Sequence, residues 1–329
     1  MEAYSVFGLT ALQTEILYEL ERRIVRNDIR SDEKNSVRKA EWLSQWTESI
    51  EAYFKDTLKI RKTKLFDKCT EKELIGYINS DSENNVWKYM VLLECVLFPA
   101  YFPMSEEDGK KYKGLKLSKQ SKREMLGIIA FRFLGVDAKY IGIFEKAYGK
   151  SVKRMSNYWL KVGGIAAGVM ALSLIAIFTF QYEILGLFAA EGTSGAALIS
   201  SGLAALGGGA VAAGGGGMAA GTAVFVGGGI LLGAAAGIPS GVVVATATNS
   251  KLFLSQAAKM EVVLKEIVLA IQKDTAYFQK ILFSLSNELA ELTVEVQRLK
   301  SEDEKNKKKI AELQKSIGYL ESVIGSARK

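Results

Sequence analysis

Apolar residues in the N-terminal part of the chain recur with the period of an α-helix. One set follows steps of three and four residues and therefore shares a single helix face: Leu9, Leu12, Ile16, Leu20 and Ile24. A second set repeats every four residues: Trp42, Trp46, Ile50, Phe54 and Leu58. An aromatic stripe of this kind is typical of a buried core rather than of a ligand site. The pattern therefore predicts two helices that bury these faces.

A third apolar run, residues 86–98, ends at Pro99, which cannot continue a helix. A polar loop follows it, and two further helices are expected after the loop, over residues 123–134 and residues 138–148. Gly135 is placed to end the first of them and Asp137 to cap the second. Strand signals are scarce, so residues 1–158 are interpreted as an all-α domain, a bundle of helices.

Residues 86–149 resemble the TerB-like helical domain, in which a helix, an acidic loop and further short helices form a compact bundle. In that family the acidic loop can hold a metal ion. In this chain Pro103 and Met104 stand between the helix and the acidic residues, which come only at positions 106–108. Metal binding is therefore not carried over from the family. What the resemblance implies is a cytosolic helical module of the kind attached to membrane-related or stress systems.

Charge is almost absent from the middle of the chain. Residues 162–250 hold only two charged residues, Glu183 and Glu191. The stretch 162–182 alone is long enough to cross a bilayer core of about 30 Å. We therefore predict that residues 159–250 form a glycine/alanine-rich membrane region with two or four transmembrane helices.

Basic residues gather immediately before this region. Residues 104–161 hold fourteen lysines and arginines against six acids, a net +8, while the whole chain carries +7. The basic residues nearest the region are predicted to bind lipid headgroups: Lys150, Lys153, Arg154 and Lys161. Lys251 and Lys259 follow the region. Both flanking parts are therefore expected in the cytosol, as is the N-terminus, where no secretory signal is visible, and the number of crossings is expected to be even.

Glycine occurs in the uncharged region at regular intervals. Eight glycines form pairs or a row spaced by four residues, which places each set along one side of a helix: Gly164, Gly168, Gly217, Gly221, Gly229, Gly233, Gly237 and Gly241. In hydrocarbon an unpaired backbone amide is so costly that the chain forms helix despite the glycine, and small residues then let helix backbones approach closely. The pattern resembles the glycine-zipper segments of membrane-inserting and channel-forming proteins and the small glycine/alanine-rich interferon-inducible membrane proteins.

Beyond residue 251 the apolar period becomes a heptad. The main part of this coiled-coil seam is formed by Leu289, Leu292, Val296, Leu299, Ile310, Leu313, Ile317 and Leu320. Asp303 and Asn306 fall on seam positions in a polar stretch, where either one helix continues or the chain turns into a hairpin. Because the register is preserved across that stretch, the interpretation favours one long coiled-coil helix over residues 251–329. Its seam packs on the N-terminal bundle, on a second copy of the chain, or on both.

The residue inventory limits the available chemistry. The chain has no histidine and only two cysteines, Cys69 and Cys95, which lie far apart. Histidine-based catalysis and histidine or cysteine metal sites are excluded, and a reduced, cytosolic setting is expected, with a single disulfide as the alternative. The glycine runs lack a phosphate-loop lysine and the acidic partner of a dinucleotide site. We therefore expect no catalytic residue, cofactor or metal, and no nucleic-acid partner, because the C-terminal basic residues alternate with acids.

Together these patterns predict a non-enzymatic, all-α membrane protein. It would oligomerise through its glycine rows and perturb or permeabilise a membrane, while a cytosolic domain or the coiled coil binds a partner protein. One alternative is a membrane-anchored scaffold that recruits a protein through the coiled coil and opens no path for ions. Another is a soluble α-helical pore-forming toxin component that inserts when triggered. A further one is a permanently soluble protein in which the glycine/alanine-rich region is a buried helical hairpin or a flexible linker, and the most distant is an enzyme that works through acidic residues.

Overall fold

The computed structural model of the chain describes residues 9–56, 60, 62–80, 85–101, 110–162, 258–259, 261–302 and 307–328. All regular secondary structure in these residues is helical, which confirms the predicted all-α class. The chain divides into two compact units. The described part of the N-terminal unit ends at Glu145, and that of the C-terminal unit begins at Lys146.

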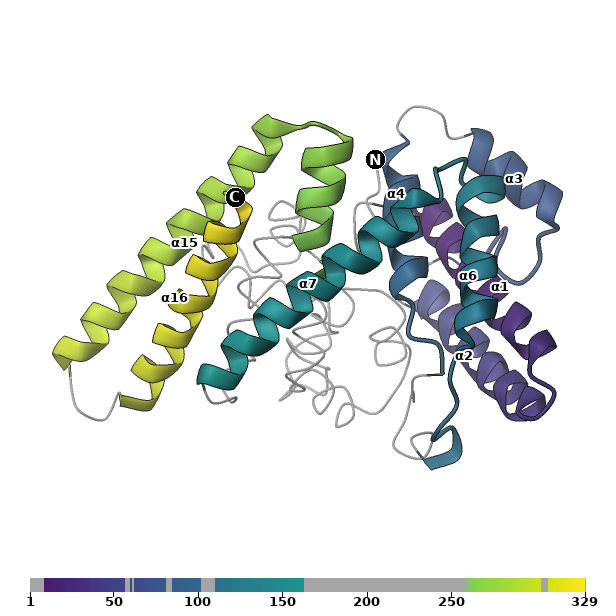
Figure 1. The fold of residues 1–329 in the computed structure, drawn as a ribbon, viewed down its shortest axis with the longest axis horizontal. Helices are drawn as coiled ribbons and strands as arrows, with labels where there is room; N and C mark the ends of the chain where they lie inside the picture. The colour runs from purple at the N-terminus through teal and green to yellow at the C-terminus, as the bar shows by residue number, and fades with distance from the viewer. Residues whose placement is uncertain are drawn as a thin grey trace. The chain divides into compact units, whose positions relative to one another are not determined.

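The N-terminal unit is built around its first helix. Its α-helices, labelled in Figure 1, are α1 (Ala11–Ser31), α2 (Ser36–Asp56), α3 (Glu71–Ser80), α4 (Val86–Leu97), α6 (Lys119–Ile128) and the first turns of α7 (Lys139–Val162). A short π-helix, η1 (Ile129–Phe133), directly follows α6. Helix α1 contacts α2, α4 and α6. A capping box begins it, in which Thr10 Oγ1 accepts from the Gln13 N–H at 3.2 Å and Gln13 Oε1 accepts from the Thr10 N–H at 2.9 Å.

The aromatic stripe of α2 forms the centre of this unit, as the sequence predicts. Trp42, Trp46, Ile50 and Phe54 are each at most 1% exposed. Tyr18 of α1 meets Trp46 and Phe54 edge to face, with ring centroids 6.1 and 5.7 Å apart. The predicted apolar face is buried as well, at Leu9 just before α1 and at Ile16, Leu20 and Ile24 within it, whereas Leu12 is half-buried. The two sequence stripes therefore pack on one another through aromatic contacts.

A buried carboxylate joins α1 to three other segments of the N-terminal unit. Asp28 of α1 is fully buried and pairs with Lys39 of α2, whose side chain is only 2% exposed. Asp28 also accepts hydrogen bonds from the Tyr101 hydroxyl at 2.6 Å and from the Ser118 backbone N–H at 2.8 Å. Burial and the bond to Asp28 raise the pKa of Tyr101, so its hydroxyl remains a donor. Asp32 also forms an ion pair with Lys39, with 2.8 Å between Asp32 Oδ2 and Lys39 Nζ.

Helix α6 begins earlier than the sequence pattern indicates. The helix expected over residues 123–134 starts at Lys119, because the Ser118 hydroxyl oxygen accepts from the Ser121 N–H at 3.4 Å and caps it. Its last turn widens into the π-helix η1. Gly135 then takes a left-handed φ of 63° and ends the element, as predicted.

Helix α7 is longer than expected. Asp137 Oδ1 accepts from the Lys139 N–H at 2.9 Å, in agreement with its predicted capping role. The helix does not stop at residue 148 but continues to Val162. Gly149 lies inside it, and a single glycine costs a helix only about 1 kcal/mol relative to alanine. Helix α3, by contrast, has no counterpart among the predicted helices.

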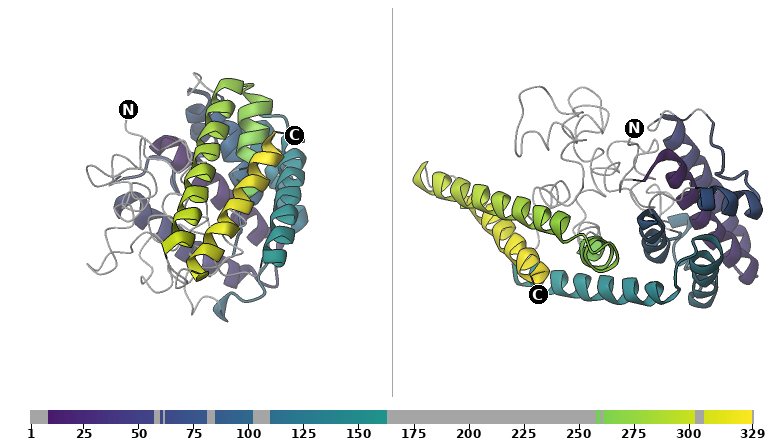
Figure 2. Two further views of the ribbon diagram at one scale, coloured as in Figure 1. Left: turned by 90° about the vertical axis from the view of Figure 1, so that its left-hand side faces the viewer. Right: turned by 90° about the horizontal axis from the view of Figure 1, so that it is seen from above.

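The C-terminal unit contains a helical hairpin in place of one long helix. Its elements are the later turns of α7, the π-helix η3 (Val263–Ile271), α15 (Thr275–Glu302) and α16 (Lys307–Ala327). Helix α16 returns alongside α15 and packs on it (Figures 1 and 2). The prediction of a continuous coiled-coil helix over residues 251–329 is therefore wrong. A second break follows η3, where Lys273 takes a left-handed φ of 57°.

The heptad seam explains why the hairpin forms. Val296 and Leu299 are buried near the end of α15, and Leu292, Ile310 and Ile317 pack against them. The stripe that one long helix would present to a partner is thus covered by its own continuation. Burial within one chain needs no association, so its entropic cost is smaller than that of a coiled coil between chains.

The uncharged middle of the chain lies outside the described residues, which resume at Ala258 after Val162. The predicted transmembrane helices of residues 159–250 fall almost entirely within it. Among the helices that the structure describes, none is both long enough and apolar enough to span a bilayer.

Candidate functional site

The two segments that flank residues 163–257 meet at a buried carboxylate. Glu261, just before η3, has a side chain only 7% exposed. The Ser151 hydroxyl and the Arg154 guanidinium, both on α7, donate to its Oε2, and the Ser326 hydroxyl of α16 donates to its Oε1 at 2.9 Å. Lys265 forms an ion pair with Oε1 at 3.1 Å. These five residues are called the Glu261 junction below.

Ser326 completes the junction by accepting from both of its cations. Arg154 Nη1 donates to Ser326 Oγ at 2.7 Å, and Lys265 Nζ donates to the same oxygen and to the Ser326 carbonyl, each at 2.7 Å. Helix α7, the turn before η3 and the end of α16 are therefore held by one carboxylate and one hydroxyl. Ser151 and Glu261 are 110 positions apart, so no local sequence pattern links them.

Acid is expected to weaken the Glu261 junction. Burial by itself raises the pKa of Glu261, but hydrogen bonds from Ser151 and Arg154 outweigh it and hold the pKa below the usual range of glutamate. In the unfolded chain the pKa of a glutamate is about 4.3. The stabilisation that ionised Glu261 gives to the folded protein is therefore complete above that pH, and it is lost as the pH falls through the lower pKa of the folded state. At pH 7, Glu261→Gln should lower the free energy that holds the end of α16 in place by about 1.5–3 kcal/mol. Amide exchange over residues 317–328 should therefore become about 10- to 100-fold faster.

Hydrogen–deuterium exchange of the full chain, corrected for the intrinsic effect of pH, measures both effects. Glu266→Gln is the matched control, since Glu266 lies on the next turn and makes no ion pair among the residues that the structure describes. Equal exchange rates in the wild type and Glu261→Gln at pH 7, or the same acid sensitivity in both, would contradict the stabilising role of the carboxylate.

The four predicted headgroup ligands all lie on α7, and residues 150, 153, 154 and 161 share one face of it. Lys150 and Lys153 are exposed. Arg154 is directed to Glu261 and Ser326, so part of this face is already engaged within the protein. Lys161 belongs to the helix, but its side chain lies outside the described part of the structure.

The predicted helix-packing glycines all lie outside the described residues: Gly164, Gly168, Gly217, Gly221, Gly229, Gly233, Gly237 and Gly241. The coiled-coil seam is placed on α15 and α16. The structure brings Leu292, Val296, Leu299, Ile310 and Ile317 together in the hairpin. Leu289 is half-buried on α15, and nothing is described of the side chains of Leu313 and Leu320.

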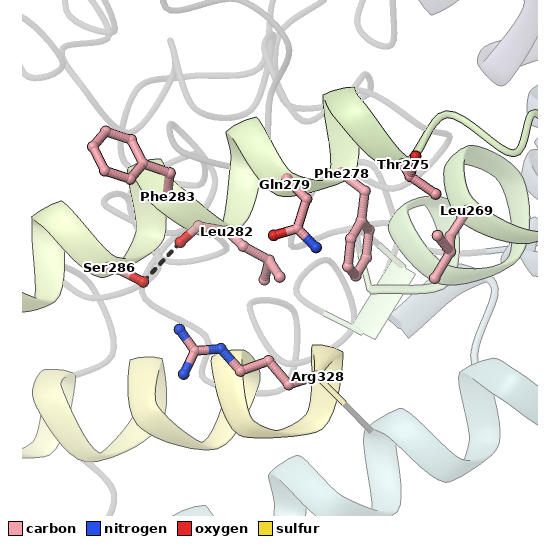
Figure 3. Close-up of a pocket in the computed structure, with 8 residues that line it drawn as sticks. All are labelled: Leu269, Thr275, Phe278, Gln279, Leu282, Phe283, Ser286 and Arg328. Carbon is pink, nitrogen blue, oxygen red and sulfur yellow. Dashed lines mark hydrogen bonds between the residues drawn. The ribbon is translucent and has the colours of Figure 1, made fainter.

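A cavity of about 770 Å³ opens within the C-terminal unit, between η3, the first half of α15 and the end of α16. Leu269, Phe278 and Leu282 give it apolar walls. Figure 3 shows Arg328, directly after the end of α16, across the cavity from α15, with Gln279 on the opposite wall. One of its wall residues, Arg328, follows Ser326 of the Glu261 junction by two positions in the sequence. No pattern in the sequence indicates it, because its wall residues come from three separate helices.

A second concave site lies in the N-terminal unit, where α1, α3, α6 and η1 meet. Its volume is about 470 Å³, and four arginines line it: Arg23, Arg26, Arg30 and Arg132. This site is called the arginine cleft below. Three of its arginines recur at steps of three and four along α1, which the sequence alone shows. Arg132 comes from η1, more than one hundred residues later, and only the fold brings it there.

Nothing among the described residues forms a cluster of three or more acids or cysteines that suits a metal ion. Cys69 and Cys95 are both free thiols, and burial raises the pKa of Cys95. Comparisons with protein families, curated proteins and solved structures yield no match to this chain. The resemblance of residues 86–149 to TerB-like domains therefore stays a prediction.

Proposed function

We propose that the chain is a non-enzymatic membrane protein that oligomerises through the glycine rows of residues 159–250 and perturbs or permeabilises the bilayer. The observation that carries this proposal is the nearly uncharged stretch of residues 162–250, whose two flanking segments are tied together at the Glu261 junction. A stretch of that length without basic residues finds its most favourable surroundings in hydrocarbon. The helical units at both ends remain in the cytosol.

The Glu261 junction supports an even number of crossings. Arg154 precedes the uncharged stretch and Glu261 follows it, and the two side chains form an ion pair. Charged groups in contact outside the hydrocarbon lie on the same side of the membrane. A chain that leaves one side and returns to it has crossed an even number of times. Two or four spans both satisfy this condition.

Each part of the chain then has a physical role. The glycines at 229, 233, 237 and 241 form the surface through which helices of neighbouring copies approach. Lys150, Lys153 and Lys161 bind anionic headgroups next to the first span, with Arg154 shared between headgroups and Glu261. The hairpin of α15 and α16 and the N-terminal bundle offer surfaces for a partner protein.

Two experiments on the full chain test this proposal. Alkaline carbonate extraction of expressing cells should leave the protein in the membrane pellet. Tags at the two ends should also be digested together, or protected together, when protease is added to sealed membrane vesicles, because an even number of crossings puts both ends on one side. Release by carbonate would favour the triggered toxin, and one digested end with one protected end would contradict the even number of crossings.

The membrane-anchored scaffold is the second candidate function, and the α15–α16 hairpin favours it. The hairpin leaves Phe283 and Val294 exposed, at 67% each, on a helix whose other face is already packed. Such a surface suits recruitment of another protein. Equal dye leakage from vesicles with and without the chain would favour the scaffold over permeabilisation.

A further inference from the structure

The arginine cleft of the N-terminal unit concentrates positive charge in a concave site. Arg23, Arg26 and Arg30 project from one side of α1, and Arg132 comes from η1. Glu71, at the start of α3, is the only acid among the residues that line the cleft, which leaves a formal charge of +3 from four arginines and one glutamate. A volume of about 470 Å³ lies in the range of sites that hold small ligands.

One guanidinium in the cleft is held rigidly. Arg23 Nε donates to Glu19 at 2.7 Å, Arg23 Nη2 donates to the Cys69 carbonyl at 3.1 Å, and the guanidinium lies 5.6 Å from the centre of the Phe133 ring. Glu19 is itself fully buried and accepts from the Asp67 N–H at 3.1 Å. These contacts use Nε and Nη2 and leave Nη1 without a partner among the described residues. Arg132 is paired with Glu71.

The other two arginines are not paired in this way. The side chains of Arg26 and Arg30 are exposed and make no ion pair or hydrogen bond with any residue that the structure describes. They lie one helical turn apart, where like charges repel. Arg30 gains from the negative end of α1, since it is in the last turn. Arg26 gains nothing comparable from the fold, and a bound anion would relieve the repulsion.

The floor of the cleft is apolar. Met125 is 8% exposed, Phe133 is 2% exposed, and Ile128 at the rim is 44% exposed. Phe131, one residue from Arg132, is 81% exposed. Cations on one wall and apolar side chains on the floor suit a ligand with an anionic head and a hydrophobic body.

We propose that the arginine cleft binds a phosphate group carried by a molecule with an apolar part. Guanidinium groups match the geometry of phosphate oxygens and form charge-assisted hydrogen bonds with them. Arg26 and Arg30 bind the phosphate, Arg23 offers a fixed third donor, and Met125 and Ile128 contact the apolar part. Phosphate of this kind is supplied by a lipid headgroup or by a soluble phosphate ester. The site is independent of whether residues 163–257 enter a membrane.

Calorimetric titration of the purified full chain in a neutral detergent tests the site and separates the two sources. The probes are glycerol 3-phosphate and dihexanoyl phosphatidate, which carry the same phosphate monoester without and with an apolar body. The variant is Arg26→Ala/Arg30→Ala, in which both changes are at exposed positions. The matched control is Arg123→Ala, an exposed arginine of α6 that does not line the cleft.

The double variant should bind both probes about tenfold more weakly or worse, while Arg123→Ala keeps wild-type affinity. Phosphatidate should bind the wild type at least about tenfold more tightly than glycerol 3-phosphate, because only it covers the apolar floor. Equal affinities would assign the site to soluble phosphate esters and overturn the role of the floor. Binding of neither probe, or an equal loss in Arg123→Ala, would overturn the site itself, whatever carbonate extraction shows of the membrane segment.

Discussion

Replacing Asp28 by alanine is expected to lower the free energy of unfolding of the N-terminal unit by about 3–5 kcal/mol. The carboxylate has no contact with water and is shared by Lys39, the Tyr101 hydroxyl and the Ser118 N–H. Without it, Asp32 is the one acid that still pairs with the buried Lys39 ammonium among the residues that the structure describes. The Tyr101 hydroxyl and the Ser118 N–H lose their acceptor as well, and each unsatisfied buried donor costs about 1–3 kcal/mol.

Denaturant unfolding followed by tryptophan fluorescence measures this change, since Trp42 stacks on Trp46 in the same core and contacts Tyr101. Glu33→Ala is the control, because Glu33 is an exposed acid of the neighbouring turn and should change the free energy by no more than about 0.5 kcal/mol. The double variant Asp28→Ala/Lys39→Met should lose less free energy of unfolding than the sum of the losses in the two single variants, since it removes the buried lysine together with its partner. A loss below about 1 kcal/mol in Asp28→Ala would show that the network does not hold the unit together.

The sequence predicts the core of the N-terminal unit well because its signal is local. Helical spacing of apolar residues decides which face of α1 and α2 is buried, and Trp42, Trp46 and Phe54 are buried as expected. Helix caps are local too, so Asp137 and Gly135 are placed correctly. Boundaries differ where a short polar side chain such as Ser118 begins a helix inside a stretch that looks like loop.

Contacts between residues far apart in the sequence are not predicted, because no local spacing encodes them. Asp28 and Tyr101 are 73 positions apart, and Ser151 and Glu261 are 110 positions apart. The arginine cleft combines the two kinds of contact. The helical spacing of its α1 arginines can be read from the sequence, whereas no local pattern indicates that Arg132 joins them. The residues with the strongest electrostatic constraints are therefore the ones that the sequence identifies least.

The hairpin of α15 and α16 shows a different limit of the heptad pattern. A heptad determines which face of a helix is apolar, but not which surface covers that face. The preserved register between Leu299 and Ile310 fits one continuous helix and a hairpin equally well. In the structure, α16 packs on α15, so that Val296 lies in one apolar cluster with Ile310 and Ile317 of the same chain.

In the middle of the chain, Gly233→Leu is expected to reduce dye release from vesicles to the level of protein-free vesicles. This prediction rests on the proposed permeabilisation and on the row of glycines at 229, 233, 237 and 241. In a bilayer, helices associate through close backbone contact because lipid offers no hydrophobic driving force between them. A leucine in the row separates the backbones and costs about 1–3 kcal/mol at each interface of an oligomer.

Ala235→Leu is the matched control, since residue 235 lies on the side of an ideal helix away from the glycine row and the change adds similar bulk. It should release dye at the wild-type rate. Both variants should remain in the carbonate-resistant pellet and keep the wild-type unfolding transition of the N-terminal unit, so that a loss of release reports helix packing alone. Undiminished release by Gly233→Leu would reject the glycine row as the oligomer interface. Equal loss in both variants would mean that the segment tolerates no added volume on any side, as expected for a tightly buried hairpin rather than for helices that meet through one face.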